Sequence, residues 1–254
     1  MIKHQPAERS VFPIGTGTSD TCRRSRLAGT PERCNLISRR SMHTNRRVGG
    51  LCLCLLVVLG GCLGLQEPRN TIQYYTLEYP RPELKDKTPL PVVIKVERFT
   101  VAPAYNSHRI IYQDQRFKRD EYYYHKWRSN PGDMVRYLLT RDIRESGLFK
   151  AVLPYESRFP YSFILEGSVD EFLEEETPSQ WNGVLCVSIV LLKADETDVV
   201  KRMVFQKTYR ARAACPDQSP RGLAQAMSTA MAEISEEILR DLYEAAKARV
   251  GGMP

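Results

Sequence analysis

The sequence predicts an α+β fold. We expect a two-layer sandwich, with a mostly antiparallel sheet of about six or seven strands and a short and a long helix on one face. Three observations lead to this prediction. Segments rich in β-branched and aromatic residues recur between residues 72 and 211. One short helical pattern interrupts them, and one long helical pattern follows them. Each helix has a single apolar stripe, which has to be buried against the sheet.

The candidate strands are short and separated by Pro-, Asp- or Gly-containing connectors. Residues 161–169 alternate between apolar and polar side chains, as expected of a strand with one buried face. Residues 184–193 are almost wholly apolar, as expected of a central strand. The other candidate strands are 72–79, 92–99, 109–113, 121–125, 149–153 and 200–211.

Both helices have local start signals. Asn130 can cap the first helix, with Pro131 at its first position, and Gly147 marks its end. The second helix opens at Ser219–Pro220. Its apolar residues recur at spacings of three and four over about 25 residues. Ile234 lies in the middle of this stripe, so we expect it to be among the most buried residues.

The N-terminal part of the chain contains an export signal. Arg46 and Arg47 precede an apolar run over residues 48–59, and small residues follow it. The run is shorter than the roughly 20 apolar residues that span a bilayer. Its end, Leu59-Gly60-Gly61-Cys62, resembles a bacterial lipoprotein signal, in which Cys62 becomes the acylated first residue. The alternative is an ordinary secretory signal in which Cys62 occurs by chance.

These features divide the chain into four parts. Residues 1–41 are an upstream extension or a disordered leader, because they lack apolar periodicity and Met42 opens a well-proportioned signal. Residues 42–61 are the signal peptide, and residues 62–70 are a short tether. Residues 71–250 then form one domain.

The charge distribution argues against a nucleic-acid partner. The full chain carries a formal charge of +7. Residues 1–61 contain ten Lys or Arg and three Asp or Glu, which leaves 27 of each kind in the rest of the chain. The expected mature protein therefore has no net basic charge to attract phosphate backbones.

Catalytic and metal-binding patterns are missing from the expected mature chain. His108 and His125 are its only histidines, and neither lies in a sequence typical of a nucleophile with its base. No phosphate-binding loop or Cys/His cluster is present, so we expect no enzyme activity, no cofactor and no metal. The acidic residues 171–176 end a candidate strand and are interpreted as a solvated loop edge. The alternative is a catalytic carboxylate pair, because Glu166 and Asp170 lie nearby in the sequence.

Two cysteines of the domain form a candidate disulfide. An exported compartment permits a bond between Cys186 and Cys215. The alternative is two separate thiols, because a hairpin turning at residues 195–198 would place Cys186 opposite about position 207.

The segment 121–127 is a candidate partner interface. Tyr122 and Tyr124 are expected on one face of its strand, with Trp127 nearby, and Tyr123 and His125 on the other face. Rings on both faces suit a subunit or partner contact. The alternative is that one face completes the core.

Several segments together resemble the auxiliary lipoproteins of ABC-type transport systems, which accompany MCE-family lipid carriers and include paraquat-inducible lipid-transport lipoproteins. They are Tyr74–Leu77, Ile110–Tyr112, Tyr122–Trp127 with Pro131–Met134, Leu138–Leu153 and Ala224–Leu239. The most specific is the Tyr-Tyr-x-His-x-Trp pattern that ends at Trp127.

The resemblance implies a non-catalytic periplasmic component of a lipid transporter. Its partners would be an MCE-family protein and an inner-membrane ABC permease and ATPase, and it could form a homo-oligomeric ring. Leu63 follows Cys62 where an inner-membrane retention signal would have Asp, which favours the outer membrane. The alternative function is structural support of another envelope complex, such as a secretin or an exporter, without lipid transport.

Overall fold

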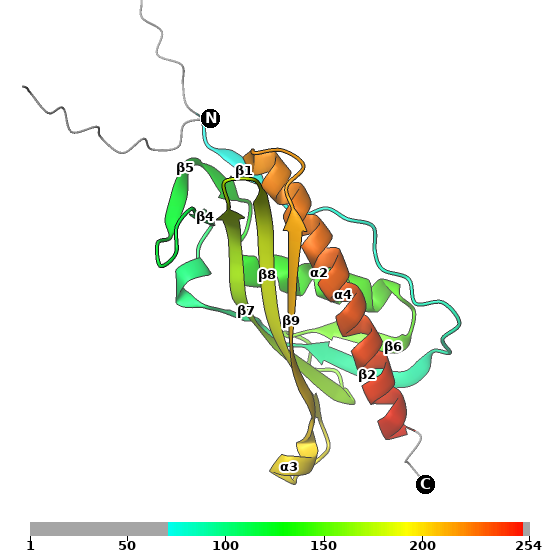
Figure 1. Cartoon of the computed structure of the whole chain (residues 1–254). Helices are drawn as coiled ribbons and strands as arrows, with labels where there is room; N and C mark the ends of the chain where they lie inside the picture. Colours follow the sequence, from blue (N-terminus) through cyan, green and yellow to red (C-terminus); the bar gives the residue numbers. More distant parts are fainter. Residues whose placement is uncertain (1–70, 251–254) are drawn as a thin grey trace, which may run out of the picture. The chain divides into compact units, whose positions relative to one another are not determined.

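A computed structural model describes residues 71–250 (Figure 1). They form nine strands in one sheet, three α helices and one 3-10 turn. The strands are β1 (Gln73–Tyr75), β2 (Leu90–Val96), β3 (Thr100–Val101), β4 (Arg109–Gln113), β5 (Asp120–Trp127), β6 (Phe149–Pro154), β7 (Phe163–Glu176), β8 (Trp181–Lys193) and β9 (Met203–Ala214). The helices are α2 (Pro131–Glu145), α3 (Val199–Arg202) and α4 (Pro220–Val250), and η1 (Pro103–Tyr105) is the 3-10 turn.

Strand β7 organises the sheet. One of its edges pairs with β8 in antiparallel register over its whole length. The other edge pairs in parallel register with β2, then β3, then β4. This arrangement is possible because β7 has 14 residues, so it extends over about 45 Å at the usual rise of a strand.

The sheet is mixed, so the prediction of a mostly antiparallel sheet is wrong. Besides the three parallel partners of β7, the pairs β1–β5 and β2–β6 are parallel. Among the strands of residues 71–250, only β4–β5, β7–β8 and β8–β9 are antiparallel. Side chains alternate between the two faces of a sheet in parallel and in antiparallel pairs alike. The alternation in the sequence therefore shows which face a residue lies on, but not which strand is the neighbour or in which direction that neighbour runs. The class α+β is confirmed.

The two predicted helices begin where their local signals place them. The Asn130 side chain accepts a hydrogen bond from the Gly132 N–H at 3.0 Å and caps α2. Beyond the other end of α2, Gly147 has a φ of 67°, a conformation that glycine adopts without strain. The Ser219 hydroxyl accepts from the Gly222 N–H at 3.0 Å and caps α4.

Helix α4 covers the inner face of β8 and β9 (Figure 1). Every other residue of β8 is fully buried on this face, namely Leu185, Val187, Ile189 and Leu191. At Gly183 the strand comes so close to α4 that an added Cβ would lie 2.9 Å from the Met227 sulfur. Ile234 is 2% exposed, which confirms its predicted place in the core.

A buried carboxylate joins the two long helices. Asp142 of α2 is completely buried, and its Oδ2 accepts a hydrogen bond from Ser235 of α4 at 2.6 Å. Tyr79, which follows β1, donates to the same oxygen at 2.6 Å. Arg141 donates from Nε to Oδ1 at 2.8 Å. The carboxylate therefore connects three segments that are distant in the sequence.

Candidate functional site

The outer face of strands β7, β8 and β9, which points away from α4, carries a row of polar side chains. Side chains of a strand alternate between its two faces. On β8, Cys186, Ser188 and Val190 therefore point away from the α4 side. Their neighbours across the sheet are mostly polar, with Glu171 and Arg210 beside Cys186, and Ser168 and Thr208 beside Ser188.

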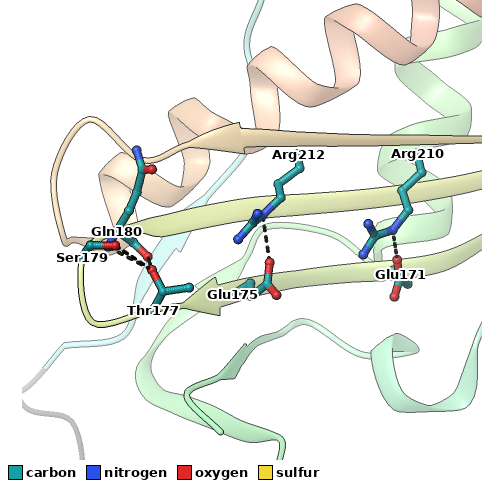
Figure 2. Close-up of polar contacts among 7 residues, drawn as sticks. All are labelled: Glu171, Glu175, Thr177, Ser179, Gln180, Arg210 and Arg212. Carbon is teal, nitrogen blue, oxygen red and sulfur yellow. Dashed lines mark hydrogen bonds and ion pairs between the residues drawn. The ribbon is translucent and has the colours of Figure 1, made fainter. Parts of the chain in front are cut away.

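Two ion pairs reach over the central strand of this face. Arg210 Nε lies 2.7 Å from an oxygen of Glu171, and Arg212 Nε lies 2.8 Å from an oxygen of Glu175. The arginines belong to β9 and the glutamates to β7, with β8 between them, as Figure 2 shows.

The arginine side chains shield β8 from solvent. In the register of the sheet, Arg210 lies beside Cys186 and Arg212 beside Val184. Although this is the outer face, Cys186 is only 7% exposed and Val184 only 1%. Long aliphatic stems commonly cover apolar surface in this way while the charged head stays in water. We call Glu171, Glu175, Arg210 and Arg212 the charged sheet face.

A polar groove continues this face toward the middle of the sheet. It has a volume of about 500 Å³ and is lined by Arg98, Tyr155, Glu166, Ser188 and Gln206, among others. The guanidinium of Arg98 lies over the ring of Tyr155, 4.1 Å from its centre. The face therefore combines charges of both signs with an open concave region.

A tight turn fixes the other end of the charged sheet face. The Thr177 hydroxyl donates to the Gln180 carbonyl at 2.7 Å and accepts from the Gln180 N–H at 3.0 Å (Figure 2). These bonds close the connection between β7 and β8 directly beyond Glu175 and Glu176. The interpretation of residues 171–176 as a loop edge is wrong, because they continue β7 and their outer carboxylates pair with β9.

Two of the three predicted interface aromatics are in the core. Tyr122 is 5% exposed and Trp127 is 1% exposed, whereas Tyr124 is half-buried. The Tyr122 hydroxyl donates to the fully buried Glu174 at 2.9 Å. Trp127 packs edge-on against Phe172, with ring centres 5.1 Å apart. Tyr122 and Trp127 are therefore corrected from interface residues to core residues.

The predicted disulfide is also corrected, because Cys186 and Cys215 are free thiols. The Cys215 N–H donates to the Trp181 carbonyl, so Cys215 lies level with the start of β8. Cys186 is five residues further along that strand, about 17 Å away at the usual rise. A disulfide needs Cα atoms within about 7 Å. Cys186 faces Arg210 rather than position 207, because the turn of the hairpin contains α3.

Some of the remaining predictions concern residues that the structure does not describe, and others concern residues 71–250. Cys62, the signal peptide 42–61, the tether 62–70 and the segment 1–41 lie outside the described residues. Within residues 71–250, no three His, Cys, Asp or Glu side chains come together as metal ligands. Over the same stretch, none of the helices combines the length and the apolar composition that a membrane crossing requires.

Comparison with known proteins identifies the family. A family model described as the ABC-type transport auxiliary lipoprotein component matches residues 75–239. The chain belongs to this family. The match covers β5, α2, the three strands of the charged sheet face and most of α4. The family is one of accessory lipoproteins, so the protein is a membrane-anchored component of the cell envelope that is associated with an ABC transport system.

Solved structures show the same fold. Protein XCC0632 from Xanthomonas campestris is similar with a TM-score of 0.64 at 16% identity, over 70% of this chain and 99% of that one. A further uncharacterised protein is similar with a TM-score of 0.53 at 13% identity, over 68% of this chain and 99% of that one. No functionally curated protein matches the sequence.

Proposed function

We propose that this auxiliary lipoprotein is a non-catalytic docking module of an ABC/MCE-type lipid transport system. It would be held at the periplasmic face of the outer membrane by an acyl chain on Cys62. An MCE-family protein would bind to it, and an inner-membrane ABC permease and ATPase would drive the transport. The family match carries the proposal, and the charged sheet face is the surface that we assign to the partner.

The properties of the charged sheet face support a role in recognition. Arg210 is 56% exposed and Glu171 is 33% exposed in their ion pair, and the second pair is similar. Exposed pairs contribute little to folding, typically about 0–1 kcal/mol. Fixed charges of both signs do determine which partner fits and how fast it associates. The charged sheet face therefore offers specificity without being needed for the core.

The anchor is tested by mass spectrometry of the mature N-terminus. We expect an acylated Cys62, and we expect a Cys62→Ala chain to leave the membrane fraction. An unmodified N-terminus at another residue would contradict the anchor. Residues 62–70 would keep the domain within about 30 Å of the membrane, because nine residues extend no further.

The docking surface is tested by co-purification with the MCE-family protein of the same transporter. Glu171→Arg places like charges together and should weaken binding. The double variant Glu171→Arg/Arg210→Glu restores the ion pair with reversed polarity. If the partner recognises these charges, the double variant should regain the stability that Glu171→Arg loses, but it should still bind the partner weakly. The exposed pair of Lys87 and Glu244 joins α4 to another segment, so Glu244→Ala is the matched control.

The outcomes separate the two candidate functions. Recovery of binding in the double variant would show that the ion pair only supports the fold. No binding by the unsubstituted acylated chain would contradict lipid transport and favour structural support of a secretin or an exporter. A homo-oligomeric ring is part of the proposal, and the mass of the purified particle in solution tests it.

A further inference from the structure

Exposed apolar side chains occur at separate places on β1, on β5 and in the turn before β5. Tyr74 of β1 is 51% exposed, and Ile72, the residue before β1, is 44% exposed. Tyr123 of β5 is 68% exposed, and Phe117 in the turn between β4 and β5 is 91% exposed. Figure 1 shows these strands at one end of the domain and α3 at the opposite end.

Phe117 is unfavourable in its turn for two independent reasons. Its ring is almost completely exposed, although a large apolar ring favours burial. Its φ is 66°, in the left-handed region that bulky residues rarely adopt. A glycine or asparagine would fit this position without either cost. Strained residues of this kind concentrate at functional sites, so the position of Phe117 points to a contact outside the domain.

Cationic side chains flank this ring. The Arg116 guanidinium lies 5.2 Å from the centre of the Phe117 ring. Lys118 is held by Asp114 and Asp120 at 3.4 and 3.8 Å. Arg116 and Arg119 are exposed and form no ion pair with any residue between 71 and 250. Arg119 donates one hydrogen bond, from Nη1 to the Lys118 carbonyl at 3.4 Å. The turn therefore presents an aromatic ring with one guanidinium group beside it and a second one two residues further along, and neither pairs with a carboxylate of residues 71–250.

The chain geometry brings this turn within reach of the proposed anchor. Residues 62–72 separate Cys62 from β1, and eleven residues extend to at most about 40 Å. Gln73 pairs with His125 in parallel register, so Phe117 is eight residues back along β5 and its turn. Eight extended residues correspond to about 26 Å. The acyl chain and the turn can therefore contact one bilayer at the same time.

We propose that the turn 114–119 is a second membrane contact. Phe117 inserts at the interface of the bilayer that holds the anchor, and Arg116 and Arg119 bind the phosphates of anionic headgroups. Aromatic rings favour the headgroup level of a bilayer, and basic residues are attracted to anionic lipid surfaces. One projecting ring is too small to form the apolar centre of a stable protein interface, which buries roughly 800 Å² on each partner. The inference rests on the membrane anchoring in the proposed function.

The test measures whether position 117 enters the bilayer. The mature chain from residue 62 onward, with Cys62→Ser and an N-terminal histidine tag, is attached to vesicles through nickel-chelating lipids. The vesicles contain phosphatidylglycerol with brominated acyl chains, which quench tryptophan at contact. The native Trp127 and Trp181 are 1% and 8% exposed, so the chain without further substitution gives the background. Because the tag replaces the acyl chain, this test stands even if Cys62 is not acylated.

We expect Phe117→Trp to lose most of its added emission on these vesicles. The matched control is Val199→Trp in α3, which is 83% exposed at the opposite end of the domain and should keep its emission. If Phe117→Trp and Val199→Trp lose the same fraction of their added emission on the vesicles, the proposed membrane contact is wrong. If Phe117→Ser instead lowers capture of the MCE-family protein, the turn belongs to a protein interface and the proposal is wrong.

The role of the arginines is tested in the same background. Adding Arg116→Gln and Arg119→Gln to Phe117→Trp should weaken the quenching. Vesicles in which brominated phosphatidylcholine replaces the brominated phosphatidylglycerol, with the nickel-chelating lipid kept, should weaken it too. Quenching that is unchanged by both would overturn the binding of anionic headgroups.

Discussion

The Tyr79 hydroxyl donates a 2.6 Å hydrogen bond to the buried carboxylate of Asp142, 63 residues further along the chain. This bond holds the segment after β1 against α2, and Ser235 of α4 donates to the same oxygen. The contact between these three segments depends on the Asp142 carboxylate, because the hydroxyls of Tyr79 and Ser235 both lose their acceptor if it is removed.

We expect Asp142→Ala to lower the free energy of unfolding by about 3–5 kcal/mol, the usual cost of breaking a buried charged cluster from one side. Urea unfolding followed by circular dichroism measures the change. Glu236→Ala is the control, because Glu236 forms an exposed pair with Arg240 on α4, and such changes usually stay within about 0.5 kcal/mol. Equal effects of the two substitutions would contradict the role of Asp142.

The stability should fall at alkaline pH partly because of Tyr79. Burial and the neighbouring Asp142 raise the pKa of Tyr79 above its ordinary value of 10.0. In this situation the unfolded chain releases the phenolic proton first, so the stabilising contribution is complete below pH 10 and is lost as the pH rises beyond it. We expect Tyr79→Phe to flatten the decline of the urea midpoint above pH 10. Tyr137→Phe, on an exposed side chain, is the control.

Gly183 should not tolerate a side chain. An added Cβ would lie 2.9 Å from the sulfur and 3.0 Å from the backbone nitrogen of Met227. Since the backbone of α4 cannot move as a side chain can, Gly183→Ala should cost about 1–3 kcal/mol, as overpacked cores do. Thermal unfolding measures the loss. An unchanged midpoint would mean that α4 does not approach β8 this closely.

Both thiols of the domain should be unreactive in the folded protein. Burial raises the pKa of Cys215 from 9.0 to about 12, with Glu174 as the next cause. Burial also raises the pKa of Cys186. Because the thiolate is the reactive form, alkylation by iodoacetamide at pH 9 should be slow before denaturation and rapid after it. A mass of the denatured, unreduced chain that lacks two hydrogens would instead show a disulfide.

Local signals in the sequence were sufficient for most elements. Asn130, Pro131 and Gly147 specify both ends of α2 through capping and backbone geometry, which involve only neighbouring residues. The candidate strand 109–113 matches β4. The stripe around Ile234 identified the buried side of α4, because helical spacing depends on one segment alone.

Relationships between distant segments were not predictable in this way. Nothing near Asp142 indicates that Tyr79 and Ser235 converge on it. Tyr122 and Trp127 were expected at a surface, but β5 pairs irregularly with β4, and both side chains enter the core. One feature of the sequence does indicate the charged sheet face. Acidic residues at positions 171 and 175 of one strand have basic counterparts at positions 210 and 212 of another. That match becomes visible only when β8 is known to lie between them.

Helix α4 follows all the strands of the sheet in the chain, and this order has a consequence for synthesis. Ribosomes make every strand of the sheet before this helix, and until residues 220–250 are available, the inner side chains of β8 and β9 lack the cover that α4 provides. Leu185, Val187 and Ile189 would then face water or other chains. Folding of the domain can therefore be completed only after residues 220–250 have been made, and until then these side chains form an aggregation-prone apolar surface.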